Sequence, residues 1–298
     1  MKKTIKQMSG VMILNKELDS PKFYDQFLLL QKCFKRDGVS LTLTYNELLN
    51  STDSSPYADY DFALYYDKDL LLARALENNN VIVFNNETAL SVCDDKALTY
   101  LSLHDLKNVK LIPSAFSPLR FSGSFRLNSK FIQRILSLYQ YPFIVKEVRG
   151  SYGNEVHLID NDTEFLQVLQ KIQNRQFIVQ KYIESSKGRD IRVWVVGNKV
   201  ILAVNRKSDD DNEFRSSISQ GGKYEMILDL PIELKNLASR ISKKLRMDFG
   251  TIDFLYGPMS GEYYFCEANT NAVFSNLDLR IGETIVDYVM RSVYDKVE

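Results

Sequence analysis

Short apolar runs alternate with amphipathic stretches along the first third of the chain. Apolar residues recur at helical spacing over 23–34 and 70–76, and a further helical pattern covers 94–103. Between these stretches, compact runs rich in β-branched and apolar residues predict strands at 10–14, 39–44, 60–65, 81–84 and 109–112. Strands separated by helices are typical of a small parallel sheet.

The remaining two thirds have a different pattern. After a loop-like stretch at 113–125, a compact unit is predicted, with helices at 129–139 and 163–172 and strands at 142–146, 156–159 and 177–180. Gly197-Asn198 joins two β-rich runs, 189–196 and 199–205, and so indicates a hairpin. A helix at 232–245, a second hairpin of 250–256 and 263–267, and a helix at 281–294 follow. The pattern predicts an α/β protein in three parts, 1–112, 113–183 and 184–298.

Composition excludes several classes of function. Lys and Arg number 38, as do Asp and Glu, so the chain lacks the basic excess of a protein that holds nucleic acid by its phosphates. Three scattered cysteines and two histidines leave little for a zinc site or a Ser-His-Asp triad. No apolar run is long enough to cross a bilayer or to serve as an export signal. We expect a cytoplasmic protein without a membrane or nucleic-acid partner. Whether it forms a homo-oligomer is left open.

Lys146 ends an apolar strand and is followed at once by the turn Gly150-Ser151-Tyr152-Gly153. A lysine beside a glycine turn can place an ammonium and several backbone N–H groups around phosphate oxygens. The alternative is an ordinary hairpin with an exposed lysine.

Oxygen-bearing side chains mark the last predicted hairpin. Asp253 lies in one strand, and Glu267 and Asn269, two residues apart, point to the same face of the other. Such a set suits Mg²⁺, which takes one or two carboxylates together with substrate phosphates and water. The alternative is a solvated pair of acids, although both carboxylates lie in apolar runs where an unpaired acid is costly to bury.

A polar loop between the two hairpins carries further basic residues. Arg206 precedes it, and Arg215, Ser216 and Ser217 lie within it. Arginines opposite a metal site could clamp a phosphoryl group during its transfer, and the alternative is a flexible polar loop.

Taken in order, these segments resemble the ATP-grasp superfamily, and most closely its RimK-like carboxylate–amine ligases. The matching segments are the strand ending in Lys146, the glycine turn, Gln180-Lys-Tyr-Ile183, Gly188-Arg-Asp-Ile-Arg192, Asn205-Arg-Lys207, Phe214-Arg-Ser-Ser217 with Gly221-Gly222, Ile252-Asp253 and Glu267-Ala-Asn269. The resemblance is strongest between 142 and 269, and Asp94-Asp-Lys96 extends it more loosely. It implies an ATP-grasp fold behind an N-terminal parallel-sheet lobe.

The resemblance also implies roles for individual residues. Lys96 and Lys146 would contact ATP phosphates under a flap of Gly150, Ser151, Tyr152 and Gly153. Gln180, Lys181, Tyr182 and Ile183 would face the adenine, and Asp190 the ribose. Arg192 and Arg206 would line the acyl-phosphate region, with Arg215, Ser216 and Ser217 near the triphosphate. Asp253, Glu267 and Asn269 would bind Mg²⁺, with Mn²⁺ as an alternative.

By this resemblance the protein is an ADP-forming ligase that joins a small-molecule or peptide carboxylate to an amine through an acyl phosphate. An idle ATP-binding scaffold and phosphoryl transfer to another acceptor are the alternatives. Thr270, Asn271 and Ala272 replace the usual residues after the last metal ligand, and this change leaves the substrates open. We further expect residues 149–154 and 209–219 to form a lid that becomes ordered when nucleotide binds.

Overall fold

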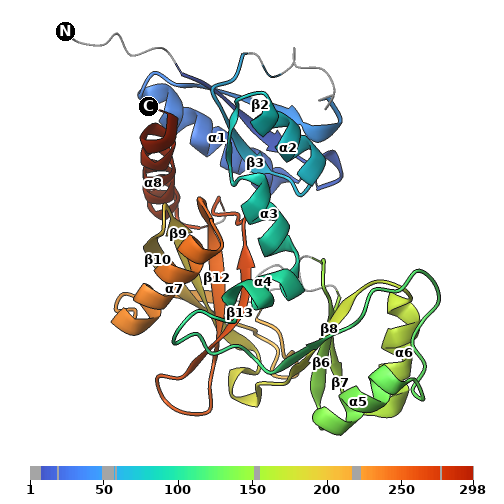
Figure 1. Ribbon diagram of the computed structural model, residues 1–298. Helices are drawn as coiled ribbons and strands as arrows, with labels where there is room; N and C mark the ends of the chain where they lie inside the picture. Colours follow the sequence, from blue (N-terminus) through green and yellow to red (C-terminus); the bar gives the residue numbers. More distant parts are fainter. Residues whose placement is uncertain are drawn as a thin grey trace.

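The computed structural model describes residues 8–18, 20–48, 57, 59–150, 155–216, 223–275 and 277–297. Within these residues the strands form three sheets, stacked from the N-terminal lobe at the top of Figure 1 to the other two sheets below it. The fold is mixed α/β, as the sequence predicts.

The N-terminal sheet has the strand order β2–β1–β3–β4, and every pair in it is parallel. Its strands are β1 (Ser9–Leu14), β2 (Ser40–Tyr45), β3 (Phe62–Tyr66) and β4 (Ile82–Phe84), joined through α1 (Pro21–Arg36) and α2 (Leu70–Asn78), with short 3₁₀ turns at Lys16–Leu18 and Asn46–Leu48. The apolar residues of α1 face the core at helical spacing, and α2 begins where the Asp69 side chain accepts from two backbone N–H groups. The predicted parallel sheet is confirmed.

The central sheet has the order β5–β8–β6–β7 and is antiparallel. It contains β5 (Ser114–Phe116), β6 (Phe143–Glu147), β7 (Val156–Ile159) and β8 (Phe177–Lys181), covered by α5 (Lys130–Leu138) and α6 (Asp162–Ile172). The buried apolar side chains of its core come from residues 125–179, and the half-buried Ala115 of β5 packs against them.

The C-terminal sheet has the order β11–β10–β9–β12–β13 and is also antiparallel. Its strands are β9 (Arg189–Val196), β10 (Lys199–Lys207), β11 (Lys223–Met226), β12 (Phe249–Tyr256) and β13 (Tyr263–Asn269). A 3₁₀ turn at Glu184–Ser186, α7 (Ile232–Lys244) and α8 (Leu279–Val297) complete this part. Both predicted hairpins are present, and strand β11 was not predicted.

The helix expected over 94–103 is present as α4 (Lys96–Leu103), which begins after Asp95, whose side chain accepts from Leu98 N. A further helix before it, α3 (Glu87–Asp94), was not predicted. Two other predictions about this region are wrong. The expected strand at 109–112 forms a single bridge, between Leu111 and Phe265. The strand β5 lies instead inside the stretch predicted as a loop.

The cores cross the predicted boundaries between parts. One core joins Phe34 and Phe62 of the N-terminal lobe to Trp194, Phe249 and Val289 of the C-terminal part. A second packs Tyr100 and the residues around Ile112 onto α7 and β13. The division at 112 and 183 stays a prediction about folding units.

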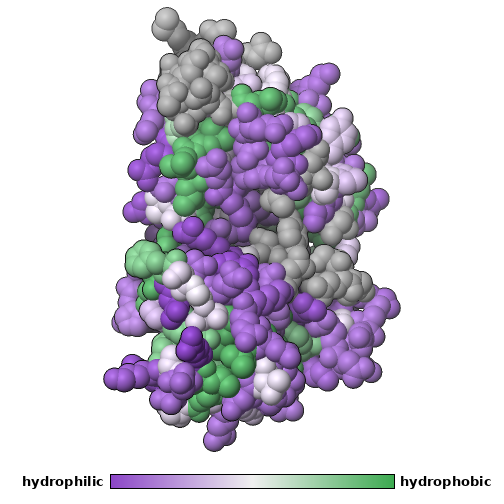
Figure 2. All heavy atoms as spheres, turned by 90° about the vertical axis from the view of Figure 1, so that its right-hand side faces the viewer, coloured by the Kyte–Doolittle hydropathy of each residue, from purple (hydrophilic) through white to green (hydrophobic). Residues whose placement is uncertain are grey.

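The surface seen in Figure 2 is mostly hydrophilic, with hydrophobic side chains in scattered groups. Among the described residues, no helix combines the length and the hydropathy needed to span a membrane.

Candidate active site

Two adjacent antiparallel strands bring the predicted metal ligands together. Asp253 on β12 lies opposite Glu267 on β13, and Asn269 follows two residues later on the same face. The Asn269 amide Nδ2 donates to Glu267 Oε1 at 3.1 Å. All three side chains line a cavity of about 450 Å³. The alternative of a solvated acid pair does not fit Asp253, which is 1% exposed.

Two arginines hold Asp253 from the neighbouring strands. Arg192 on β9 donates through Nε to Oδ1 at 2.8 Å and through Nη2 to Oδ2 at 2.6 Å. Arg206 on β10 donates to the same Oδ2 at 2.9 Å. Arg206 also makes a bidentate pair with Asp190, at 2.7 and 2.5 Å. Two acids and two arginines therefore alternate across β10, β9 and β12, which satisfies charges that would be costly to bury alone.

This network shifts the pKa values of its acids in opposite directions. Burial raises the pKa of Asp253, but Arg192 and Arg206 outweigh it and hold that pKa below the usual value for aspartate. Burial raises the pKa of Asp190 despite its pair with Arg206. The pKa of Arg206 lies above its ordinary value, because both carboxylates favour the charged guanidinium more than burial opposes it. Both Asp190 oxygens accept from Arg206, so its predicted contact with a ribose stays a prediction.

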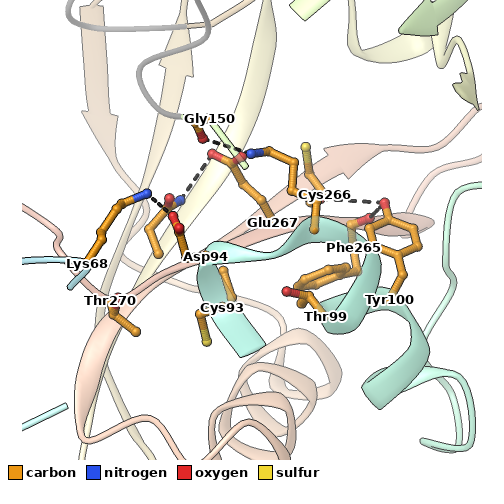
Figure 3. A pocket seen from close by; sticks show the side chains of 13 residues that line it. Lys68, Cys93, Asp94, Thr99, Tyr100, Gly150, Phe265, Cys266, Glu267 and Thr270 are labelled. Carbon is orange, nitrogen blue, oxygen red and sulfur yellow. Dashed lines mark hydrogen bonds and ion pairs between the residues drawn. The ribbon is translucent and has the colours of Figure 1, made fainter. Parts of the chain in front are cut away.

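The predicted phosphate lysines line the same cavity, close enough together for the charge of Lys146 to act on Lys96. Lys146 on β6 is 5% exposed and lines the cavity, so the alternative of an exposed hairpin lysine is wrong. Lys96 opens α4, and its Nζ donates to the carbonyl of Gly150 at 2.8 Å. Burial lowers the pKa of Lys96, and Lys146 and Lys68 add to this effect while Glu267 opposes it. Figure 3 shows the Glu267 carboxylate pointing toward Gly150.

The segment predicted to face adenine covers the last two residues of β8 and the two that follow it. Gln180, Lys181, Tyr182 and Ile183 all line the large cavity. Gln180 Nε2 donates to Ser114 Oγ at 2.8 Å, and Lys181 N donates to the carbonyl of Pro113 at 3.0 Å. Strand β5, unforeseen in the sequence, therefore fixes this edge.

The polar loop contributes Arg215 and Ser216 to the cavity lining. Arg215 is paired with Glu213, through Nε at 2.9 Å and Nη2 at 2.8 Å. The predictions for Ser151, Tyr152, Gly153 and Ser217, and with them part of the lid, fall on residues outside the described part of the chain.

Residues from the N-terminal lobe that the sequence analysis did not single out also line the cavity. Lys22 and Phe23 come from the start of α1, and Lys68 follows β3. The position of Lys68 just after a predicted strand was a signal in the sequence, because ligands of parallel sheets bind beyond the carboxyl ends of the strands.

The donors fit the groups that the sequence predicts. Two carboxylates and an amide oxygen in one cavity are hard ligands of the kind Mg²⁺ takes, and Lys96 and Lys146 in the same cavity suit phosphate. Among the described residues no three His, Cys, Asp or Glu side chains gather as a metal site, so a zinc-type centre is not formed there.

Comparisons with known proteins place this architecture in a class. The model superimposes on the D-alanine–D-alanine ligase of Bacillus anthracis with a TM-score of 0.71, at 18% identity, covering 97% of each chain. It superimposes on a RimK-domain ATP-grasp protein of Sphaerobacter thermophilus with a TM-score of 0.69, at 18% identity, covering 94% of this chain and 99% of the other. The fold is therefore that of the ATP-grasp proteins.

The sequence places the chain within that class. Residues 107–293 match the model of the RimK-like ATP-grasp domain, and the chain belongs to this family. It is 33% identical over 231 residues to human N-acetylaspartylglutamate synthase A, covering 75% of this chain and 56% of that enzyme. The resemblance inferred from the motifs is confirmed.

Proposed function

We propose that this protein is an ATP-dependent carboxylate–amine ligase that forms an amide bond through an acyl phosphate and releases ADP and phosphate. One observation carries the proposal: Lys96 and Lys146 line the same cavity as Asp253, Glu267 and Asn269. Family membership supports ATP-dependent ligation. One relative is named N-acetylaspartylglutamate synthase A, and the product in that name contains an amide bond between a carboxylate and an amine.

The proposed chemistry needs positioning and charge, not a nucleophilic side chain. A substrate carboxylate oxygen attacks the γ-phosphorus of ATP, and the bond to the β–γ bridging oxygen breaks to release ADP. An amine then attacks the acyl carbon, the C–N bond forms, and phosphate leaves as the nitrogen loses a proton. Lys96 and Lys146 hold phosphate oxygens during the first step.

Asp253, Glu267 and Asn269 would hold Mg²⁺, or Mn²⁺ in its place, which neutralises charge on the phosphates. Arg192 and Arg206 line the cavity beside these ligands. Their guanidinium groups are fixed by Asp253 and Asp190, so they offer oriented positive charge near the phosphoryl group in transfer.

The test is ADP release from Mg²⁺-ATP with pools of carboxylic acids and amines, followed by mass analysis of the products. We expect ADP and an amide whose mass equals both substrates less one water. Glu267→Gln is the matched control, because it keeps the size of the side chain and removes a charged ligand. A phosphorylated product without an amide would indicate phosphoryl transfer to another acceptor, and ATP binding without ADP release would indicate an idle scaffold.

A further inference from the structure

The edge strand β13 carries two of the three proposed metal ligands, Glu267 and Asn269. On its inner side β13 pairs with β12, and the last pair of that ladder is Thr251 with Asn269. On its outer side the described residues contribute one bridge, between Leu111 and Phe265, nearer the start of the strand. The ends of a strand pair fray unless another contact holds them, so Asn269 depends on a further support.

That support comes from the N-terminal lobe. Asn85 directly follows β4 and is completely buried. Its Nδ2 donates to the carbonyl of Thr270 at 3.2 Å and to the carbonyl of Phe249 at 2.8 Å. Its Oδ1 accepts from the backbone N–H groups of Asp248 at 2.6 Å and Phe249 at 3.2 Å. Both hydrogens and both lone pairs of one amide are therefore used, and they join the start of β12 to the residue after Asn269.

The two strands that Asn85 joins are not equally free to move. Strand β12 lies inside the sheet, where Phe249 pairs with Val196 of β9. Asp248, directly before β12, is buried and ion-paired with Lys296 near the end of α8. The Asn85 amide is thus held on the β12 side, and the strand whose position it decides is β13.

Two close contacts carry that position to the metal ligands. Strand β12 approaches β13 so closely that a Cβ on Gly250 would lie 2.3 Å from the carbonyl oxygen of Asn269. Asn269 Nδ2 in turn donates to Glu267 Oε1 at 3.1 Å (Figure 3). Since packing this close transmits a displacement, a shift of Thr270 moves Asn269 and, through this bond, Glu267.

We propose that Asn85 is a positioning residue for the metal site: it fixes the end of β13, so that Asn269 and Glu267 are held in place to share one cation with Asp253. The inference rests on the proposed function and extends it, because it gives the N-terminal lobe a part in binding the metal. Asn85 does not line the cavity, and it acts through the backbone of Thr270. A buried amide whose hydrogen bonds are all made specifies one arrangement of the groups around it, and a partly satisfied amide does not.

The substitution Asn85→Asp tests this role with the least change of shape. The acid keeps an oxygen for the N–H groups of Asp248 and Phe249, but it turns a second oxygen, in place of a donor, toward the carbonyls of Phe249 and Thr270. The readout is the affinity for a non-hydrolysable ATP analogue, measured by calorimetry with and without Mg²⁺. We expect the gain in affinity that Mg²⁺ provides to fall by about tenfold, the ratio that corresponds to the loss of one or two hydrogen bonds. The affinity without Mg²⁺ should stay at the wild-type value.

The matched control is Gln26→Glu. Gln26 on α1 is also completely buried and outside the cavity lining, and its Oε1 accepts from the N–H of Phe274, in the segment after β13, at 2.7 Å. The same change from amide to acid should lower its midpoint of thermal unfolding, measured without ligand, and leave the gain from Mg²⁺ unchanged, because Phe274 lies further along the chain than Thr270. Asn85→Ser is a second variant for the case that the buried acid prevents folding, since its hydroxyl is neutral and too short to bind both strands at once.

The outcomes keep this inference distinct from the ligase activity. A lower unfolding midpoint with an unchanged gain from Mg²⁺ in the Asn85 variants would make Asn85 a structural residue and overturn the inference, and so would an equal loss of that gain in Gln26→Glu. A wild-type protein that gains no affinity from Mg²⁺ would overturn the metal site and this inference with it. If the wild type releases no ADP, but its gain from Mg²⁺ is present and falls in Asn85→Asp, the ligase proposal fails and the positioning role is still supported.

Discussion

The substitution Arg206→Gln removes a guanidinium that contacts two buried carboxylates at once. It deletes the bidentate pair with Asp190 and the bond to Asp253, while Arg192 still holds Asp253. Asp190, which is 5% exposed, then has no cationic hydrogen-bond partner left among the described residues. Removing one partner of a buried pair costs about 3–5 kcal/mol, a large share of the roughly 5–15 kcal/mol that holds a typical protein together.

Urea unfolding followed by circular dichroism measures the loss. With a urea slope of about 3 kcal/mol per molar, the midpoint should fall by roughly 1–1.7 M. Arg36→Gln is the control, since Arg36 makes an ion pair with Asp287 at 2.9 Å on the surface, with 59% and 44% of the two side chains exposed. Surface pairs contribute at most about 1 kcal/mol, so this variant should unfold near the wild-type midpoint.

The pH dependence gives a second, independent readout. Burial already raises the pKa of Asp190, and Arg206 opposes that rise, so the variant should have a still higher pKa there. A carboxyl whose pKa is higher in the folded than in the unfolded state weakens folding above its folded pKa, and the loss disappears as the pH falls through that value. The Arg206→Gln variant should therefore regain part of its lost stability on acidification. The double variant that also carries Asp190→Asn should regain part of that stability at neutral pH. A midpoint within about 0.3 M of the wild type would refute the reasoning.

Three further outcomes are expected. Glu267→Ala should abolish Mg²⁺-dependent ADP release and leave the circular dichroism spectrum unchanged, since Glu267 is a proposed metal ligand in a strand that is paired through its backbone. Lys146→Ala should lower the affinity for ATP by at least about tenfold, as measured by calorimetry, and the affinity for adenosine much less, because ATP alone carries phosphates. Gly250→Ala should destabilise the fold by about 1–3 kcal/mol and lower Mg²⁺ affinity, because the new Cβ would lie 2.3 Å from the carbonyl oxygen of Asn269.

Each of these outcomes has a contrary result. Near-normal ADP release in Glu267→Ala would remove that residue from the metal site. Equal loss of ATP and adenosine binding in Lys146→Ala would indicate a structural lysine. Unchanged Mg²⁺ affinity in Gly250→Ala would show that the position of Asn269 does not control the metal site.

Local patterns predicted the strands that carry the site, and they did so for a physical reason. Alternation and the turn at 257–261 predict both strands of the hairpin. A register shift between Asp253 and Phe254, which the pattern does not predict, then brings Asp253 opposite Glu267 instead of Cys266. The network of Asp190, Arg192 and Arg206 with Asp253 could not be predicted in the same way. It depends on β12 pairing with β9, two strands far apart in the sequence, and no turn between them fixes that register.

Other differences arise where short elements depend on distant contacts. The three-residue strand β5 exists because it pairs with β8, and its own residues carry no strong strand pattern. Helix α3 begins at Glu87, directly after Asn86, whose side chain accepts from Ala89 N, a capping signal that was present in the sequence. The lobe that carries Lys22 and Lys68 is tied to the segment after β13 by the hydrogen bonds of Asn271 and Ser275, which no local pattern predicts.

The distribution of the cores bears on how the cleft opens. Since the N-terminal sheet and the C-terminal sheet share one apolar core, they cannot separate without exposing it, whereas residues 125–179 carry a core of their own. A movement of the central part against the other two would therefore disrupt the least apolar packing, and this part carries Lys146 and the end of β8. In such a movement Lys22, Lys68 and Asn271 would keep their places relative to Asp253 and Glu267. On the proposed function, the half of the cavity that carries Lys146 would then be assembled by closure, and the half that carries Asp253 and Glu267 would be built in advance.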